Sequence, residues 1–292
     1  MGRISNYLSL VKFSHTVFAL PFALIGFMLG VAEVAEENIG GWFRDNWRMF
    51  AKVLLCMVFA RSAAMAFNRW LDRRFDSLNP RTAQREIPAG VIKPGEALFF
   101  TIVMSILFIL TTLSINTVVF YLSFIALFVI LFYSYTKRIT ALCHLVLGLG
   151  LALAPIGAYL SVTAYFSLLP VLFSLVVLTW VSGFDIIYAL QDEEFDREHR
   201  LHSIPAALGK GNALKLSTLL HLVSGAFVIV AGVIGHFDWL YWVGTACFIG
   251  LLIYQHLLVK PHDLSKVNMA FANTNGIASI LFAVFVILSI LI

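Results

Sequence analysis

The chain has 292 residues, of which 60% are hydrophobic and only 12% are charged, and its formal net charge is +4. A soluble domain is usually about half apolar and about one quarter charged, so this composition excludes an ordinary soluble domain. Apolar runs of roughly 18 or more residues are typical of membrane-spanning helices, and several occur here. The basic residues fall in short loops, where membrane topology explains them better than nucleic-acid binding does. The composition therefore predicts an all-α bundle in a lipid bilayer.

The apolar segments predict nine transmembrane helices, because only helices satisfy all their backbone hydrogen bonds in lipid. The first apolar stretch is long and is interrupted by Pro21, so we expect a retained helix rather than a signal peptide. In chain order, the expected spans are 15–34, 49–67, 95–113, 117–134, 141–161, 166–190, 214–235, 239–259 and 270–292.

The loops differ in charge from one side of the predicted membrane to the other. Most of the 20 basic residues fall in loops that share a side with the N-terminus. The opposite loops carry few basic residues and several acidic ones. Cytoplasmic loops carry the excess of Lys and Arg, so the N-terminus and the two longest polar loops are expected in the cytoplasm. For a bacterial chain, this means the inner (cytoplasmic) membrane.

These two polar loops are similar to each other. The first contains Asp72-Arg-Arg-Phe-Asp76 and later Ile87-Pro88-Ala89, and the second contains Asp192-Glu-Glu-Phe-Asp196 and later Ile204-Pro205-Ala206. Each loop follows a long apolar span, and four spans separate them. The pattern predicts a single domain over 1–292 with an internal duplication, roughly 15–134 and 141–259. The fold would be two related four-helix units with a ninth helix added.

Two acidic strips lie at the ends of predicted spans. Residues four apart lie about one helical turn apart on the same face. Asn68, Asp72 and Asp76 therefore share one face. Asp192 and Asp196 form a second pair with the same spacing. Carboxylates held together repel each other, and Mg²⁺ takes carboxylate oxygens while sharing phosphate oxygens. The strips favour Mg²⁺ ions that bridge a diphosphate, the alternative being solvated helix ends.

Basic side chains near the strips can reach diphosphate oxygens as direct hydrogen-bond donors. Each of them, taken singly, can also be only a topology signal. These side chains are Arg73, Arg74, Arg81, Lys137 and Arg138.

Two ionisable residues lie deeper in predicted spans. Arg61 and Asp185 each come seven residues before a strip, nearly two helical turns, and so fall on the same faces. An ionisable group inside a span costs about 2.5–3.5 kcal/mol on insertion scales, so such residues face a polar cavity or a partner. A structural ion pair is the alternative. His15, at the start of the first span, is a further candidate to contact an aromatic acceptor, or else an interfacial histidine.

The chain resembles the UbiA superfamily of membrane prenyltransferases from its first predicted helix to its last. The first aspartate-rich motif of the family is similar to the segment Asn68-Arg-Trp-Leu-Asp72-Arg-Arg-Phe-Asp76, and its second motif is similar to Asp192-Glu-Glu-Phe-Asp196. Three further segments resemble family elements, and they are Asp185-Ile-Ile-Tyr188-Ala189, Tyr133-Ser-Tyr-Thr-Lys137-Arg138 and Arg81-Thr-Ala-Gln-Arg85 with Ile87-Pro88-Ala89-Gly90.

The resemblance implies nine helices around a central cavity and Mg²⁺-dependent binding of a polyprenyl diphosphate. It implies that metal and diphosphate are bound by Asn68, Asp72, Asp76, Asp192 and Asp196. It implies that Lys137 and Arg138 assist at the diphosphate. Further candidates for substrate binding are Tyr133 and Tyr188, which lie in segments that resemble the family, and Arg61, Arg73 and His15. Arg69 departs from the family pattern, which has aspartate at this position, and we expect it to contact the diphosphate or to face solvent.

The whole-chain pattern is most similar to the 4-hydroxybenzoate polyprenyltransferase group. The segment Lys12-Phe-Ser-His15-Thr-Val-Phe-Ala-Leu-Pro21 also resembles a branch associated with menaquinone, in which the acceptor is 1,4-dihydroxy-6-naphthoate. The expected reaction in quinone biosynthesis transfers a polyprenyl group to a ring carbon of a hydroxyaryl carboxylate. Asp185 would orient the acceptor or take its proton, and Arg61 would bind the acceptor carboxylate or the diphosphate.

Three other classes of membrane protein remain as alternatives. A cation-coupled transporter can also have repeats and acidic residues in helices, but its site usually lies near the midplane rather than at helix ends. A CDP-alcohol phosphotransferase would carry an Asp-Gly-x-x-Ala-Arg element, which this sequence lacks. A structural bundle without activity would not need two matched acidic motifs.

Overall fold

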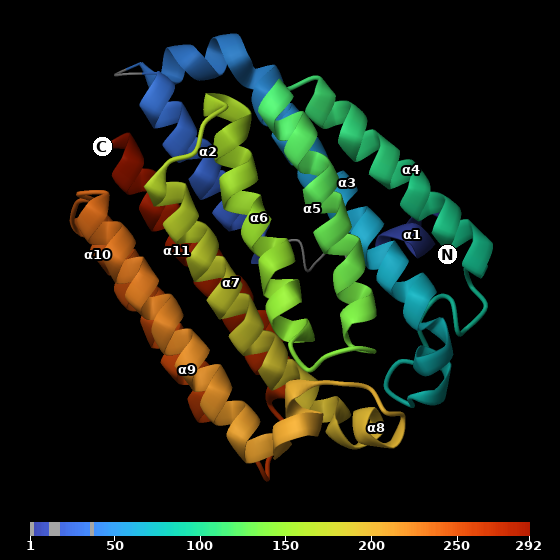
Figure 1. Cartoon of the computed structure of the whole chain (residues 1–292). Coiled ribbons are helices and arrows are strands. Elements are labelled where there is room, and N and C mark those ends of the chain that lie inside the picture. The colour runs from blue at the N-terminus through green and yellow to red at the C-terminus, as the bar shows by residue number, and fades with distance from the viewer. Residues whose placement is uncertain (1–2, 12–17, 36–37) are drawn as a thin grey trace.

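A computed structural model describes residues 3–11, 18–35 and 38–292 (Figure 1). The described chain is helical, with loops and one isolated β-bridge between Lys260 and Asp263. The elements are α1 (Arg3–Leu10), α2 (Leu20–Val34), α3 (Ile39–Leu78), α4 (Pro94–Leu113), α5 (Thr117–Thr136), α6 (Cys143–Thr163), α7 (Leu168–Ala189), the 3₁₀ helix η2 (Leu190–Asp192), α8 (Glu193–Glu198), α9 (Ile204–Ile234), α10 (Trp239–Leu258), the π-helix η3 (Met269–Thr274) and α11 (Asn275–Leu291).

The predicted all-α membrane fold is confirmed, but the count of nine spans is not. Eight described helical segments are apolar and long enough to cross a membrane. The first expected span corresponds to α2, which has only 15 residues. At about 1.5 Å per residue it is about 22 Å long, shorter than a hydrocarbon core of roughly 30 Å. His15 and the other residues of 12–17 lie outside the described part of the chain.

Two helices extend well beyond the apolar segments from which they were predicted. Helix α3 has 40 residues and continues through a kink at Asn46. Helix α9 has 31 residues and includes Gly209, whose φ of 74° interrupts the helical backbone. Hydropathy detects only the part of a helix that lies in lipid, and backbone hydrogen bonds continue into the polar ends. The extension matters because the last two turns of α3 carry the first acidic strip.

Small residues allow close helix packing around α6. A Cβ atom at Gly26 of α2 would lie 2.0 Å from the carbonyl oxygen of Pro155. A Cβ atom at Gly148 of α6 would lie 2.3 Å from Oγ of Ser182 in α7. Glycine removes the side chain from such contacts, as is common where membrane helices pack. Gly30, one turn further along α2, also lies against α6, where an added Cβ would be 3.1 Å from Cβ of Val162.

Helix α7 forms the centre of the bundle, between α6 and α9 (Figure 1). Trp180 is fully buried and packs against Phe22, Phe184 and Phe248 from different parts of the chain. Apolar side chains elsewhere, such as Phe128, point outward from α5 and are exposed, as expected for a surface that contacts lipid.

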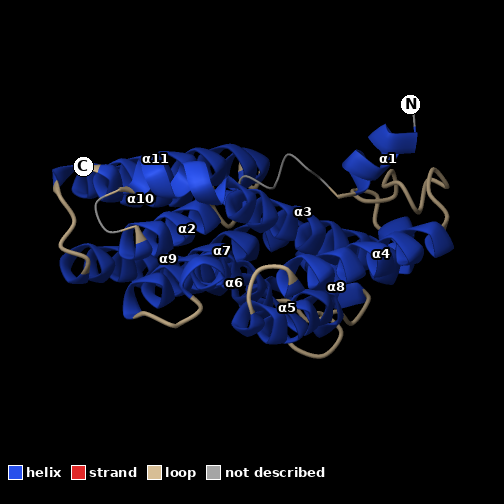
Figure 2. Ribbon diagram, turned by 90° about the horizontal axis from the view of Figure 1, so that it is seen from above, coloured by secondary structure: helices blue, strands red, loops and turns tan. Residues whose placement is uncertain are grey.

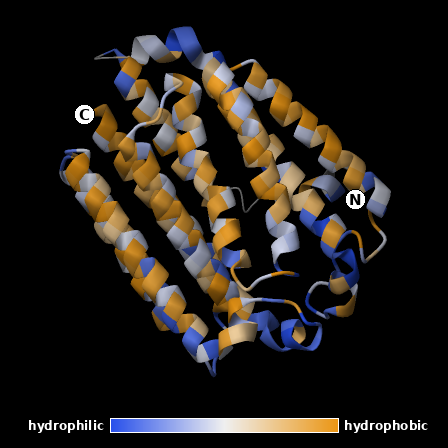
Figure 3. Ribbon diagram, in the orientation of Figure 1, coloured by the Kyte–Doolittle hydropathy of each residue, from blue (hydrophilic) through white to orange (hydrophobic). Residues whose placement is uncertain are grey.

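Polar residues gather at one end of the bundle. The hydrophilic segments in Figure 3 include α8 and the loop that joins α3 to α4, at the bottom of the view. Seen from above, α1 lies at the edge of the bundle beside α4 (Figure 2). The polar end is therefore built from the last turns of α3, α5 and α7 and the first turn of α6. The predicted internal duplication stays a prediction.

Candidate active site

A polar cavity of about 220 Å³ opens among the helix ends at the polar end of the bundle. Its walls come from α3, α5, α6, α7 and η2 and from the loop after α3. The ionisable side chains that line it are Asp72, Asp76, Asp185 and Asp192, Arg81, Arg85, Lys137 and Arg138, and His144, Cys143, Tyr133 and Tyr188. Asp72 and Asp192, which belong to the two different motifs, thus line one cavity.

The first acidic strip lies on α3 as predicted, and each of its carboxylates pairs with a cation from elsewhere in the chain. Arg138 donates to Asp72 over 2.8 Å, and Asn68 donates to the other oxygen of Asp72 over 3.1 Å. Arg85 donates to Asp76 over 2.7 Å. The residues that were expected to hold a cation therefore hold guanidinium groups in this state.

Asp192, in the second motif, accepts hydrogen bonds from the segment that follows α3. Arg81 donates to both its oxygens, from Nε over 3.0 Å and from Nη2 over 2.5 Å, and Asn79 donates to Oδ1 over 3.1 Å. Arg81 also donates to the hydroxyl of Tyr188 over 2.7 Å. Burial disfavours the charged guanidinium, but the hydrogen bond and charge of Asp192 outweigh burial and raise the pKa of Arg81. Arg81 is therefore a permanent cation of the site.

Asp196 departs from the expected second strip. It is fully buried, lies 2.7 Å from Nζ of Lys137, and does not line the cavity. The cause is a break in the helix at Asp192, which ends η2 and is the N-cap of α8. Its φ of −105° and ψ of 5° are not helical, so Asp196 does not lie one regular turn further along the same face. Burial lowers the pKa of Lys137, but the charge and hydrogen bond of Asp196 overcome it and raise that pKa. Asp196 fixes Lys137, and Lys137 faces the cavity.

The cavity suits Mg²⁺ by the chemistry of its donors but does not present a ready metal site. Within the described residues, no three His, Cys, Asp or Glu side chains converge as a metal-binding group. The available donors are carboxylate and amide oxygens, which hard cations such as Mg²⁺ prefer. Oδ2 of Asp76 is buried and accepts no hydrogen bond from the described part of the chain. Binding of a metal here would require carboxylates to exchange their present cationic partners.

Asp185 lines the cavity and contacts a residue that was not predicted from the sequence. Nδ1 of His144, in the first turn of α6, lies 2.6 Å from Oδ2 of Asp185 in α7. The side chain of His144 is 4% exposed, and that of Asp185 is 22% exposed. Asp185 therefore has an internal partner, as the alternative interpretation expected, and this partner is His144 at the cavity wall.

An apolar cavity of about 310 Å³ lies deeper in the bundle, next to the polar one. Tyr133 and Leu147 line both cavities. Among the described residues that line the apolar cavity, Arg61 is the charged one. Tyr133, which lines both cavities, lies close to Arg61. As predicted for α3, Asn68 lines the polar cavity, and Arg61, seven residues earlier in the chain, lies deeper in the bundle.

The remaining predicted site residues differ in whether they line the polar cavity. Arg69 is only 5% exposed and does not line the cavity, so the expectation that it faces solvent is wrong. Arg73 donates to the backbone oxygen of Trp70, over 2.6 Å, and its guanidinium lies over the Trp70 ring, outside the cavity lining. Tyr188 lines the cavity beside Arg81. His15 lies outside the described residues.

Sequence reasoning missed Asn79 and His144. Asn79 follows the last residue of α3, a position at which an Asn usually indicates only a helix end or turn. His144 is a single histidine in an apolar segment, and no spacing links it to Asp185, 41 residues later. Only the packing of α6 against α7 brings these two residues together.

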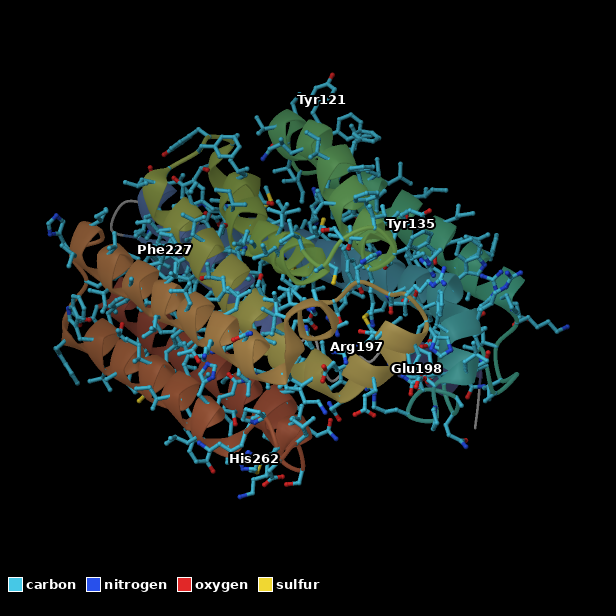
Figure 4. All side chains as sticks on the ribbon, turned by 60° about the horizontal axis from the view of Figure 1, so that its bottom comes forward. Tyr121, Tyr135, Arg197, Glu198, Phe227 and His262 are labelled. Carbon is cyan, nitrogen blue, oxygen red and sulfur yellow. The ribbon has the colours of Figure 1, made fainter. Side chains whose placement is uncertain are left out.

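Figure 4 shows the polar end turned toward the viewer. Arg197 and Glu198 mark α8 at this end, and Tyr135 marks the nearby part of α5. Tyr121, near the start of α5, lies at the far end of the same helix. The charged residues that line the polar cavity lie at this end of the bundle.

The fold and the cavities together define an integral membrane protein with a charged cavity next to an apolar one. The chain belongs to the UbiA prenyltransferase family, which it matches over residues 15–288.

Known relatives cover nearly the whole chain. It is 30% identical over 237 residues to the 4-hydroxybenzoate octaprenyltransferase of Aliivibrio fischeri, covering 81% of this chain and 82% of that one. The apo structure of a UbiA homolog from Aeropyrum pernix K1 is 30% identical and superposes with a TM-score of 0.81, covering 94% of this chain and 97% of that one. A UbiA homolog from Archaeoglobus fulgidus, bound to DMAPP and Mg²⁺, is 18% identical with a TM-score of 0.76, covering 98% and 99% of the two chains.

Proposed function

We propose that this protein transfers a polyprenyl group from polyprenyl diphosphate to a ring carbon of 4-hydroxybenzoate, with Mg²⁺ as cofactor, in quinone biosynthesis. The observation that carries the proposal is that a polar and an apolar cavity lie side by side, with Tyr133 and Leu147 in the walls of both. A prenyl diphosphate has a charged head on an apolar tail, and the two adjoining cavities match both parts. The relative named 4-hydroxybenzoate octaprenyltransferase supports this choice of acceptor.

The diphosphate would be bound by an exchange of ionic partners. It carries a charge of roughly −3 and prefers guanidinium and ammonium donors. Arg81, Lys137 and Arg138 already line the cavity as cations. When they turn to the phosphate oxygens, Asp72 and Asp192 lose their present partners. Their carboxylates would then hold Mg²⁺, which neutralises charge on the departing diphosphate. The Mg²⁺-bound state of the Archaeoglobus homolog supports this cofactor.

The prenyl tail would occupy the apolar cavity. Ile125 and Phe166 line that cavity and are also each 61% exposed at the apolar surface of the bundle. The cavity therefore has access to the surrounding lipid, and a tail longer than the cavity can extend between helices into the bilayer. Each buried methylene contributes about 0.8 kcal/mol, so most of the affinity for a long donor would come from its tail.

The acceptor would bind where the two cavities adjoin, between Arg61 and Asp185. A guanidinium pairs well with a carboxylate, so Arg61 is the proposed partner of the acceptor's carboxyl group. Asp185, at the cavity wall, is the proposed partner of the phenol. The ring carbon ortho to the phenol then forms a bond to C1 of the donor while the bond between C1 and the diphosphate oxygen breaks. Orientation of the ring and stabilisation of the leaving group supply most of the rate.

1,4-Dihydroxy-6-naphthoate is the second candidate acceptor, because it is also a hydroxyaryl carboxylate. The test is mass spectrometry of products formed by purified protein in detergent from octaprenyl diphosphate and a panel of aromatic acids. The proposal expects prenylated 4-hydroxybenzoate as the main product. Prenylated naphthoate alone would transfer the proposal to the second acceptor, and no product from any acid would contradict it. No observation supports the transporter alternative.

The polar end of the bundle is proposed to face the cytoplasm, in a bacterial inner membrane. The loop between α3 and α4 and the segment around α8 are rich in Arg and Lys, which favours that side. Labelling of a cysteine placed at exposed Glu198, in intact cells and in inverted vesicles, tests this orientation. Labelling only in the vesicles is expected, and labelling of intact cells by an impermeant reagent would contradict it.

A further inference from the structure

We propose that His144 is a positioning residue for the prenyl transfer: it holds the carboxylate of Asp185 in one orientation, so that the other carboxylate oxygen accepts the proton of the acceptor ring. This inference rests on the proposed function and deepens it, because it assigns a role to a residue that no motif includes. Three observations carry it: the contacts of the imidazole ring, the helix packing that fixes the ring, and the position of Asp185 at the cavity wall.

The contacts of His144 define its tautomer. Nε2 lies 3.3 Å from the backbone nitrogen of Ile204, the first residue of α9. The N–H groups in the first turn of a helix have no partner within the helix, so this one donates to Nε2. Nε2 is then an acceptor, and the ring proton is on Nδ1. Nδ1–H therefore donates to Oδ2 of Asp185, 2.6 Å away.

Close packing of α6 on α7 fixes the ring in place. His144 and Gly148 are four residues apart on one face of α6, and Gly148 lies against Leu178 and Ser182 of α7. Oγ of Ser182 donates to the backbone oxygen of His144 over 3.2 Å. Asp185 follows Ser182 by three residues, on the same face of α7. The glycine contact thus sets the helix separation at which the histidine reaches the aspartate.

These contacts leave one oxygen of Asp185 for substrate. Oδ2 is engaged by His144, whereas Oδ1 makes no hydrogen bond to any residue that the structure describes. The side chain is 22% exposed, and Asp185 lines the polar cavity. His144 and Leu147 also line that cavity, and Leu147 continues into the apolar one. Asp185 therefore lies near the place where the two cavities adjoin and where the acceptor ring is proposed to bind.

The ring proton is transferred to Asp185 after the new carbon–carbon bond has formed. After the bond between C1 of the prenyl group and the ring carbon has formed, that carbon still carries its hydrogen. Its C–H bond breaks, the electron pair restores the aromatic ring, and the proton goes to Oδ1 of Asp185. The diphosphate has left with the electrons of the C1–O bond. The hydrogen bond from Nδ1–H to Oδ2 holds the carboxylate in the orientation that this transfer needs.

Replacement of His144 by Gln and by Leu tests the inference. A Gln side chain can donate from its amide nitrogen to Asp185 and accept from Ile204 through its oxygen, whereas Leu can do neither. We expect His144→Gln to keep kcat within about threefold of wild type. We expect His144→Leu to lower kcat about 10²-fold, the low end for general base catalysis, without a change in KM for the prenyl diphosphate. An unchanged KM would show that the variant is folded.

A double-mutant cycle separates this role from a structural one. In an Asp185→Asn background, His144→Leu should cause no further loss of kcat, because the carboxylate that it positions is gone. Wild-type kcat in His144→Leu, or an equal loss in both backgrounds, would overturn the inference while leaving the proposed function intact. A wild-type protein that prenylates no aromatic acid would overturn the proposed function, and the inference with it.

Discussion

Arg81 donates from two of its nitrogens to the two oxygens of Asp192, although 111 residues separate them in the chain. The pair joins the loop after α3 to η2, and so connects the two similar polar loops of the proposed duplication. A bidentate pair of this kind fixes geometry as well as charge. Arg81 therefore holds the second motif against the loop that follows the first.

Loss of Arg81 should weaken both the fold and the activity. Arg81→Ala leaves Asp192 without its bidentate partner, and since the Arg81 side chain is 31% exposed we expect a loss of about 1–3 kcal/mol in stability, less than for a fully buried pair. Thermal unfolding in detergent measures this effect. Arg73→Ala is the matched control, because Arg73 also lies near the end of α3 but outside the cavity lining. Equal effects of the two variants on activity would contradict the role of Arg81.

The contact at Gly148 should be sensitive to a single methyl group. A Cβ there would lie 2.3 Å from Oγ of Ser182 and 2.5 Å from the backbone oxygen of Leu178, so Gly148→Ala must move α6 away from α7. We expect a loss of about 1–3 kcal/mol in stability from overpacking and a lower kcat through the separation of His144 from Asp185. Gly250→Ala, in α10 and outside both cavity linings, has nothing within 4 Å of the added Cβ, so it should leave kcat unchanged and should not lower the stability. A tolerated Gly148→Ala would show that the helix separation is not decisive.

The proposed role of Arg61 predicts an effect on one substrate only. Arg61→Ala removes a charge-assisted hydrogen bond to the acceptor carboxylate, worth about 1.5–3 kcal/mol, so KM for 4-hydroxybenzoate should rise about 10- to 100-fold. KM for the prenyl diphosphate should change little. An acceptor that lacks the carboxylate gives the internal control, since the variant and the wild type should use it equally. If KM rises for the diphosphate instead, Arg61 binds the donor.

The sequence was sufficient for the fold class and for most of the cavity wall. Hydropathy located the helices because lipid requires apolar side chains, and the spacing of four placed Asp72 and Asp76 together because α3 is regular at that point. The same rule failed for Asp196, because the helix is interrupted at Asp192, and nothing in the spacing of charges indicates that change. Arg69 is buried although it is charged, which hydropathy does not anticipate.

The role of His144 could not be predicted from the sequence pattern, for a different reason. Its function depends on the separation of α6 and α7, which Gly148 sets through contacts with a distant part of the chain. Local periodicity tells which residues share a face of one helix but not which faces meet.

The most direct test of the central claim is calorimetric binding of geranyl diphosphate in detergent with and without Mg²⁺, to the wild type, Asp72→Asn and Asp192→Asn, with exposed Glu198→Gln as the control. Both motifs line one cavity and are proposed to hold the same metal–diphosphate complex. We predict that the wild type and Glu198→Gln bind only when Mg²⁺ is present, and that either aspartate variant weakens this binding by about 10-fold or more, the loss of at least 1.4 kcal/mol. Binding to the wild type that is indifferent to Mg²⁺, or aspartate variants that bind as the wild type does, would contradict the account.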